Sequence, residues 1–162
     1  MRKKLFLMLL LTSSMAMAQK IFLGSPNNRL DVEVEVKGGV PTYAVYYDDF
    51  QVLQPSQLGF EADFGDFTKG MAYKENIGTD TLNMTPSRIT DIVFKERTKS
   101  VTLCTFMYKI PFKNAKGQEM TVEFRVWNNN VAFRYEIPRP GENPKCGVIR
   151  REVSSFRFPE GT

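Results

Sequence analysis

Apolar and charged side chains alternate without exception between Leu30 and Lys37, where every even position is apolar and every odd position is charged. Successive side chains of a β-strand point to opposite faces, so this stretch predicts a strand with one face buried and the other in water. Gly38 and Gly39 end the strand, and the β-rich stretch 42–47 that follows predicts its antiparallel partner. Residues 30–47 therefore predict a β-hairpin with one face buried in the core.

The same period of two recurs along most of the chain, and no segment carries a sustained apolar stripe with a period of 3.6 residues. We predict an all-β fold, an antiparallel β-sandwich with short strands joined by Gly, Pro and Asn turns. The stretch 63–87 shows neither period and predicts a long irregular loop. Further strands are expected within 51–62 (two, broken near Pro55 and Gly59), and over 89–95, 100–112, 118–127, 131–138 and 148–158.

One hairpin is predicted to the level of register. If paired residue numbers sum to 257, Phe124 faces Phe133 and Val126 faces Val131 on the apolar face, while Glu123 meets Arg134 on the other. An odd sum requires an even-length loop, either 128–129 alone or 127–130 with Asn130 left-handed. Asparagine tolerates a positive φ better than most residues, so we expect a left-handed asparagine in this loop.

Residues 1–18 are typical of a secretory signal peptide: a basic start, an apolar run over 5–11, and the small-x-small ending Ala16-Met17-Ala18. A membrane anchor needs about 20 apolar residues, and here a polar break comes after seven, so we expect cleavage before Gln19, export to the periplasm or medium, and no membrane association. Three of the 22 basic residues lie in this leader, which leaves 19 basic against 18 acidic side chains. A charge so near zero argues against nucleic acid as a partner.

The sequence contains no histidine, which excludes Ser-His and Cys-His catalytic pairs and zinc sites that need imidazole. Paired carboxylates remain the only plausible catalytic class, but the acids alternate outward on strands or lie in turns such as 48–49. Glu61, Asp63 and Asp66 flank glycines where calcium is conceivable, although no calcium-loop spacing appears. A disulfide between Cys104 and Cys146 and a buried thiol at Cys104 are both left open.

Aromatic side chains offer a further possibility, since exposed rings stack on sugars. Tyr43, Tyr46, Tyr47 and Trp127 are candidates, although strands carry aromatics for packing as well. Lys145, Arg150 and Arg151 form a small basic patch near Phe156 and Phe158.

Four stretches, in order, resemble the N-terminal domain of glycoside hydrolase family 97. Residues 25–30 (SPNNRL) resemble its opening strand, and 41–47 together with 52–61, which contain PSQLGF, resemble its second hairpin. The most specific stretch is 124–138, FRVWNNNVAFRYEIP, and 152–159 resembles the strand that follows it. Trp127 and Asn130 stand where the family usually has tyrosine or phenylalanine and glycine.

The resemblance implies a galactose-mutarotase-like supersandwich, here incomplete on its C-terminal side, ahead of a catalytic (β/α)₈ barrel in an α-glucosidase or α-galactosidase. It also implies calcium near the substrate, bound by residues beyond Thr162, and both inverting and retaining members are known. None of the barrel carboxylates is present, so no catalytic, cofactor-binding or metal-binding residue is assigned within this chain. We expect a gene fragment or truncated gene model.

The expected function is therefore the non-catalytic N-terminal part, residues 19–162, of an exported α-glycosidase that packs on its barrel, shapes the carbohydrate entrance and is inactive alone. The alternative is a free-standing carbohydrate-binding sandwich, and a third possibility is a structural envelope protein.

Overall fold

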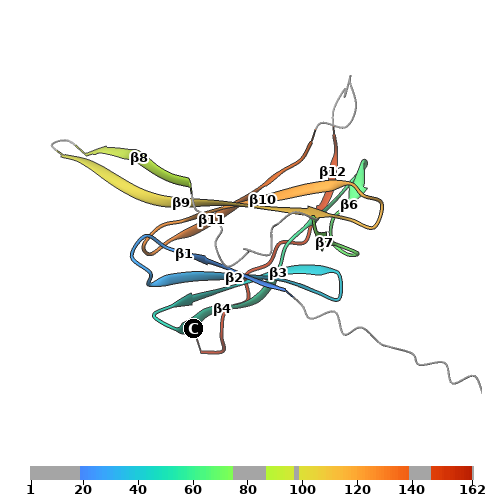
Figure 1. The fold of residues 1–162 in the computed structure, drawn as a ribbon, viewed down its shortest axis with the longest axis horizontal. Coiled ribbons are helices and arrows are strands. Elements are labelled where there is room, and N and C mark those ends of the chain that lie inside the picture. Colours follow the sequence, from blue (N-terminus) through green and yellow to red (C-terminus); the bar gives the residue numbers. More distant parts are fainter. Residues whose placement is uncertain (1–18, 75–86, 97–98, 139–146, 162) are drawn as a thin grey trace, which may run out of the picture.

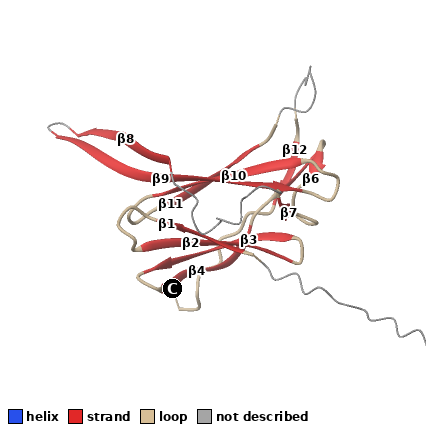
Figure 2. Cartoon of the chain, viewed as in Figure 1, coloured by secondary structure: helices blue, strands red, loops and turns tan. Residues whose placement is uncertain are grey.

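A computed structural model describes residues 19–74, 87–96, 99–138 and 147–161. All regular structure within these ranges is strand, arranged in antiparallel sheets (Figure 2). The described part of the chain has no helix of the length and apolarity needed to cross a membrane. The all-β prediction is confirmed.

The first sheet has the order β1-β2-β3-β4, made of β1 (Lys20–Gly24), β2 (Leu30–Lys37), β3 (Val40–Tyr47) and β4 (Phe50–Gln57). Its two tight turns take their conformation from residues that tolerate a left-handed backbone: Gly38 and Gly39 have φ of 59° and 78°, and Asp48 and Asp49 have φ of 49° and 67°. The first predicted hairpin is confirmed. Pro55 does not break β4, because a register shift at this point of the β3–β4 pairing accommodates a residue that cannot donate a hydrogen bond.

β1 was missed by the sequence prediction. Its residues Ile21 and Leu23 point into the core, but Phe22 between them is 51% exposed. An apolar residue on the wet face hides the period of two, so only pairing with β2 identifies this strand.

The second sheet has the order β11-β10-β9-β7, with β8 also paired to β9. It comprises β7 (Ala72–Tyr73), β8 (Ser87–Glu96), β9 (Lys99–Lys113), β10 (Glu119–Val126) and β11 (Val131–Glu136). Figure 1 shows it stacked on the first sheet, with the β8–β9 hairpin extending beyond the sandwich. Part of the predicted loop 63–87 is thus strand, since β6 (Gly65–Asp66) and β7 fall within it.

A third, small sheet has the order β12-β5-β6, from β12 (Ile149–Glu152), β5 (Phe60–Ala62) and β6. The strand predicted over 148–158 is regular only over β12. Beyond it, the Oγ atoms of Ser155 and Ser56 accept from the N–H groups of Gln57 and Arg157 at 2.8 and 2.9 Å, so side chains replace part of the ladder along β4.

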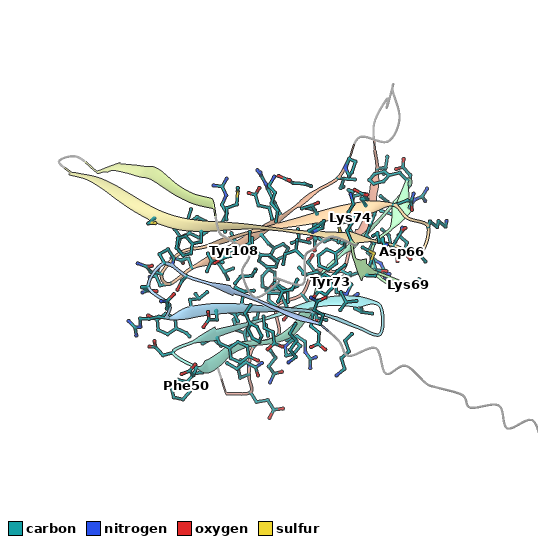
Figure 3. The ribbon with its side chains drawn as sticks, in the orientation of Figure 1. Phe50, Asp66, Lys69, Tyr73, Lys74 and Tyr108 are labelled. Atoms are coloured by element: carbon teal, nitrogen blue, oxygen red, sulfur yellow. The ribbon has the colours of Figure 1, made fainter. Side chains whose placement is uncertain are left out.

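The two large sheets share one hydrophobic core. Tyrosine hydroxyls bind across it, with Tyr108 Oη donating to the carbonyl of Gly24 at 2.7 Å and Tyr73 Oη to that of Val34 at 3.0 Å. Figure 3 shows both rings between the sheets. The ring of Tyr43 on β3 also reaches across the core and lies 5.4 Å from that of Phe133 on β11. A cross-sheet aromatic pair of this geometry adds about 0.5–1.5 kcal/mol beyond its burial.

The β10–β11 register is as predicted: Phe124 pairs with Phe133 and Glu123 with Arg134. The loop spans 127–130, closed by the Trp127 N–H donating to the Asn130 carbonyl at 2.8 Å. The expectation of a left-handed asparagine here is wrong, because positive φ values among described non-glycine residues occur only at Asn28, Asp48 and Asp49. The closing hydrogen bond forms without that conformation.

Candidate functional site

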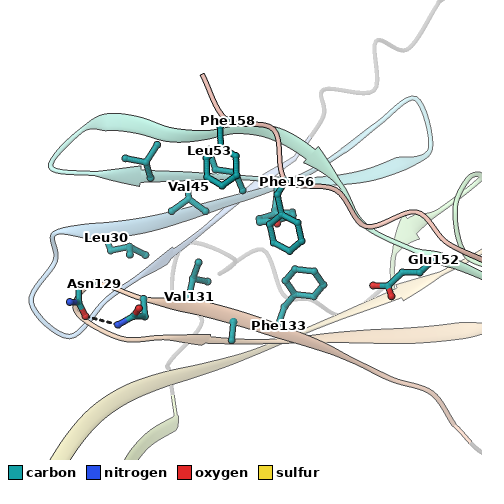
Figure 4. A pocket seen from close by; sticks show the side chains of 13 residues that line it. Leu30, Val45, Leu53, Asn129, Val131, Phe133, Glu152, Phe156 and Phe158 are labelled. Atoms are coloured by element: carbon teal, nitrogen blue, oxygen red, sulfur yellow. Dashed lines mark hydrogen bonds between the residues drawn. The ribbon is translucent and has the colours of Figure 1, made fainter. Parts of the chain in front are cut away.

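An apolar groove of about 620 Å³ opens between the β4 edge of the first sheet and the β11 edge of the second (Figure 4). Val45 and Leu53 form one wall, and Val131 and Phe133 form the other. Phe156, on the segment after β12, lies over the opening and stacks against Phe133 with ring centres 6.3 Å apart.

The rim of this groove exposes large apolar side chains. Phe156 and Phe158 are each 63% exposed and Val52 is 42% exposed. Soluble monomers seldom present contiguous apolar surface of this kind unless it meets a partner. Among the described strands β11 is also the last of its sheet, so within this part of the chain the groove runs beside a strand edge that pairs with no further strand. The groove therefore has the chemistry of a docking surface.

A second, more polar pocket of about 480 Å³ adjoins the groove at the tip of the β10–β11 hairpin. Its lining combines aromatic rings with side-chain amides, and it shares two asparagines with the groove. The described lining residues are Asn27, Tyr47, Cys104, Trp127, Asn128, Asn129 and Asn130.

The four aromatic candidates divide between core and surface. Tyr43 is buried, which overturns its assignment as an exposed ring; burial raises the pKa of its hydroxyl to about 12. Tyr46 is half-buried, and its hydroxyl accepts from Gln51 Nε2 at 3.1 Å. Tyr47 and Trp127 are the two that meet at one pocket. The neighbouring asparagines were missed by the sequence analysis, which read 128–130 only as a turn.

The acidic residues proposed for calcium are already occupied. Glu61 pairs with Arg151 at 2.5 Å, and Val148 donates its N–H to Asp63 at 3.2 Å. Asp66 accepts from the backbone and hydroxyl of Thr68, which lower the pKa of its carboxyl. No cluster of three or more potential ligands occurs within the described residues. This part of the chain does not fit a calcium ion.

Glu123 departs from the expectation that the acids face water, since it is only 2% exposed. Arg134 and Arg125 lie 2.9 and 3.2 Å from its carboxylate, and Lys109 lies 3.6 Å away. The hydrogen bond to Glu123 raises the pKa of Arg134. The predicted pairing of Glu123 with Arg134 was the one signal of this ion pair in the sequence. The sequence did not show that Lys109 of β9 would also approach the Glu123 carboxylate. Three cations around one buried acid indicate a structural network rather than a catalytic carboxylate.

Arg150 and Arg151 are exposed, and Lys145 and Cys146 lie outside the described residues, as does the leader 1–18. The choice between a disulfide and a buried thiol at Cys104 accordingly stays open, and the signal peptide stays a prediction.

The family model described as "Glycosyl-hydrolase 97 N-terminal" matches residues 23–162. The chain belongs to glycoside hydrolase family 97. It corresponds to the N-terminal domain of these enzymes, as the resemblance of its motifs predicted.

Among family 97 and related proteins, a crystal structure of a β-arabinopyranosidase has a TM-score of 0.75 and 28% identity, covering 88% of this chain and 22% of that one. A family 97 enzyme from Pseudoalteromonas sp. strain K8 in complex with panose has a TM-score of 0.68 and 18% identity, covering 86% and 20%, and supports the fold alone. A probable retaining alpha-galactosidase of Streptomyces bingchenggensis (strain BCW-1) is 25% identical over 134 residues, or 83% of this chain and 19% of that protein. The chain thus spans about a fifth of these relatives' lengths.

Proposed function

We propose that this chain is the N-terminal, non-catalytic β-sandwich of an exported α-glycosidase of α-glucosidase or α-galactosidase type. Its role is to pack on the catalytic barrel of the whole enzyme and to shape the entrance through which carbohydrate reaches the active site. The observation that carries the proposal is the apolar groove between β4 and β11, in a domain whose relatives are about five times longer.

Apolar surface is most stable when covered, and a partner that covers Phe156, Phe158 and Val52 removes from water the most exposed part of the groove rim. The relatives support carbohydrate as the ligand class: one is named a probable retaining alpha-galactosidase, and a Pseudoalteromonas enzyme was solved with acarbose. Catalysis is assigned to the partner domain, because glycoside hydrolysis normally needs two carboxylates about 5–10 Å apart across one bond. Glu123 and Glu61 are engaged in ion pairs, and Asp66 is held by hydrogen bonds from Thr68.

Calcium belongs to this proposal only through the whole enzyme. Its ligands would come from outside the described residues, because within the described residues no group of three or more acidic, Cys or His side chains gathers into a cation site. Export follows from the leader: mature protein should begin at Gln19, and an intact mass that still includes residues 5–11 would contradict it.

Activity assays on the chain and on the product of a reading frame extended beyond codon 162 test the proposal. The 162-residue chain should release no sugar from aryl α-glucosides or α-galactosides, whereas the extended product should do so and lose activity to a chelator. Turnover by the chain alone, abolished by changing one of its own carboxylates, would overturn the proposal.

The docking role is tested in the extended product by a charge in the groove. Phe158→Asp should weaken association of the two domains, because it puts a carboxylate in an apolar contact. The weaker association would be seen as a lower melting temperature and lower activity. Phe50→Asp is the matched control, since Phe50 is 78% exposed and lies outside the groove lining. Equal effects of the two changes would contradict docking through the groove.

A further inference from the structure

We propose that the pocket at the tip of the β10–β11 hairpin binds a neutral pyranose, with Trp127 and Tyr47 as the aromatic surfaces and the surrounding asparagines as hydrogen-bonding groups. The inference takes its ligand class from the proposed function and adds a sugar subsite on the sandwich itself, apart from any catalytic domain.

The size and shape of the pocket suit a small ligand. Its volume of about 480 Å³ lies within the range of about 300–1,000 Å³ that ligand pockets occupy. It is bounded by the first sheet through Tyr47 and by the hairpin loop through Trp127, so two separate parts of the sandwich converge on it.

The chemistry of the lining favours a neutral, hydroxyl-rich ligand. Two aromatic rings and four amide side chains contribute to it, and no charged side chain occurs among the described lining residues. Amides both donate and accept, which matches sugar hydroxyls, while aromatic faces match the C–H face of a pyranose ring. A phosphate or a carboxylate ligand would lack a cation here, because nearby Arg29 pairs with Asp48 outside the lining.

Several lining groups are held in place before any ligand arrives. The guanidinium of Arg29 lies 4.8 Å from the centre of the Tyr47 ring and fixes one of its faces. The Trp127 N–H to Asn130 carbonyl bond closes the loop, and Asn130 Nδ2 donates to Asn129 Oδ1 at 2.7 Å. Such preorganisation reduces the ordering cost of binding.

Two amides keep donor capacity available for a ligand. Asn27 Oδ1 accepts from Ser25 Oγ at 2.9 Å and from the N–H of Arg29 at 3.3 Å. These bonds occupy the carbonyl end of the amide and leave its Nδ2 group as the donor for a ligand. The exposed side chain of Asn128 makes no hydrogen bond within the described residues. Asn128 is therefore the lining residue whose loss should affect a ligand without affecting the fold.

The location relates the subsite to the docking groove. Asn129 and Asn130 line both cavities, so a sugar in this pocket would lie at the border of the surface on which the rest of the enzyme is proposed to pack. A carbohydrate chain held there would extend toward the domain boundary.

Trp127 is the only tryptophan of the chain, so its fluorescence reports on this pocket alone. The purified chain is titrated with methyl α-glucoside, methyl α-galactoside and maltotriose up to about 100 mM, with glycerol as the polyol control. At least one sugar should give a saturable change in Trp127 emission that glycerol does not give. Asn128→Ala should weaken that binding by roughly two- to twelvefold, which is the loss expected when one hydrogen bond to the sugar is removed. Phe50→Ala, outside the pocket lining, should leave the binding unchanged.

A flat response to every sugar, a response equal to that of glycerol, or an Asn128→Ala variant that binds like the parent would overturn the subsite. Far-ultraviolet circular dichroism of each variant checks that the fold is kept, and Trp127→Phe with calorimetry instead of fluorescence gives a second measure of lost binding. The outcome is separable from the proposed function. An active extended enzyme with an unresponsive Trp127 overturns only the subsite, and a responsive Trp127 in an inactive extended product overturns only the proposed function.

Discussion

Gly59, between β4 and β5, is the position where a single methyl group should be most harmful. Its φ is +129°, a conformation that residues with a side chain rarely adopt. A Cβ atom placed there would lie well inside 3.0 Å of the Phe67 carbonyl oxygen and 3.2 Å from Thr68 Cα. Both obstructions are backbone atoms of the packed segment after β6, so they cannot rotate away as a flexible side chain would.

The cost of Gly59→Ala can be set against the same substitution at Gly38. Backbone strain at Gly59 costs about 1–3 kcal/mol, and forcing a methyl group into filled space costs about 1–3 kcal/mol more. At either site alanine regains about 0.4–1 kcal/mol because it lowers the conformational entropy of the unfolded chain. The net loss at Gly59 is therefore about 1–6 kcal/mol. Gly38 has φ +59° and nothing within 4 Å of its Cβ position, so only about 1–2 kcal/mol of left-handed strain applies before that recovery.

Urea unfolding followed by Trp127 fluorescence and by circular dichroism measures both variants under one protocol. We expect Gly59→Ala to be less stable than Gly38→Ala by about 3 kcal/mol, which corresponds to a melting temperature roughly 10 °C lower. Equal losses of unfolding free energy for the two substitutions would contradict the close approach of the segment 67–68 to Gly59. They would also contradict the placement of β5 beside the core.

Three further changes test other parts of the sandwich. Phe124→Ala should cost about 3–5 kcal/mol, because its ring is fully buried between the sheets, whereas Phe50→Ala should stay within about 0.5 kcal/mol in the same urea assay. Tyr135→Phe should cost about 1–3 kcal/mol by leaving the N–H of Gly59 without the hydroxyl that now accepts it at 2.8 Å; a neutral result would argue against that bond. Burial raises the folded-state pKa of Tyr43 from 10 to about 12, so its contribution to stability is complete below pH 10 and is lost as the pH rises toward 12. Unfolding free energies measured from pH 9 to 12 should fall more steeply in the parent than in Tyr43→Phe, and parallel curves would contradict the burial of this hydroxyl.

The sequence by itself determined the features that depend on neighbours along the chain. The alternation of Leu30–Lys37 and the glycines after it define β2, its turn and its partner β3, as the structure confirms. The β10–β11 register follows from the same period, because a slip by one residue would move Phe124 or Phe133 out of the core.

Tertiary structure alone decided how much of each strand face is covered. Period two says that Glu123 and Phe124 point to opposite sides, but not that cations from β9, β10 and β11 would enclose the carboxylate. It also could not separate Tyr43, whose ring meets β11 across the sandwich, from Tyr47 on the same strand, which lines the surface pocket. The physical reason is that alternation is a local property of one strand, whereas burial is set by which distant strand packs on it.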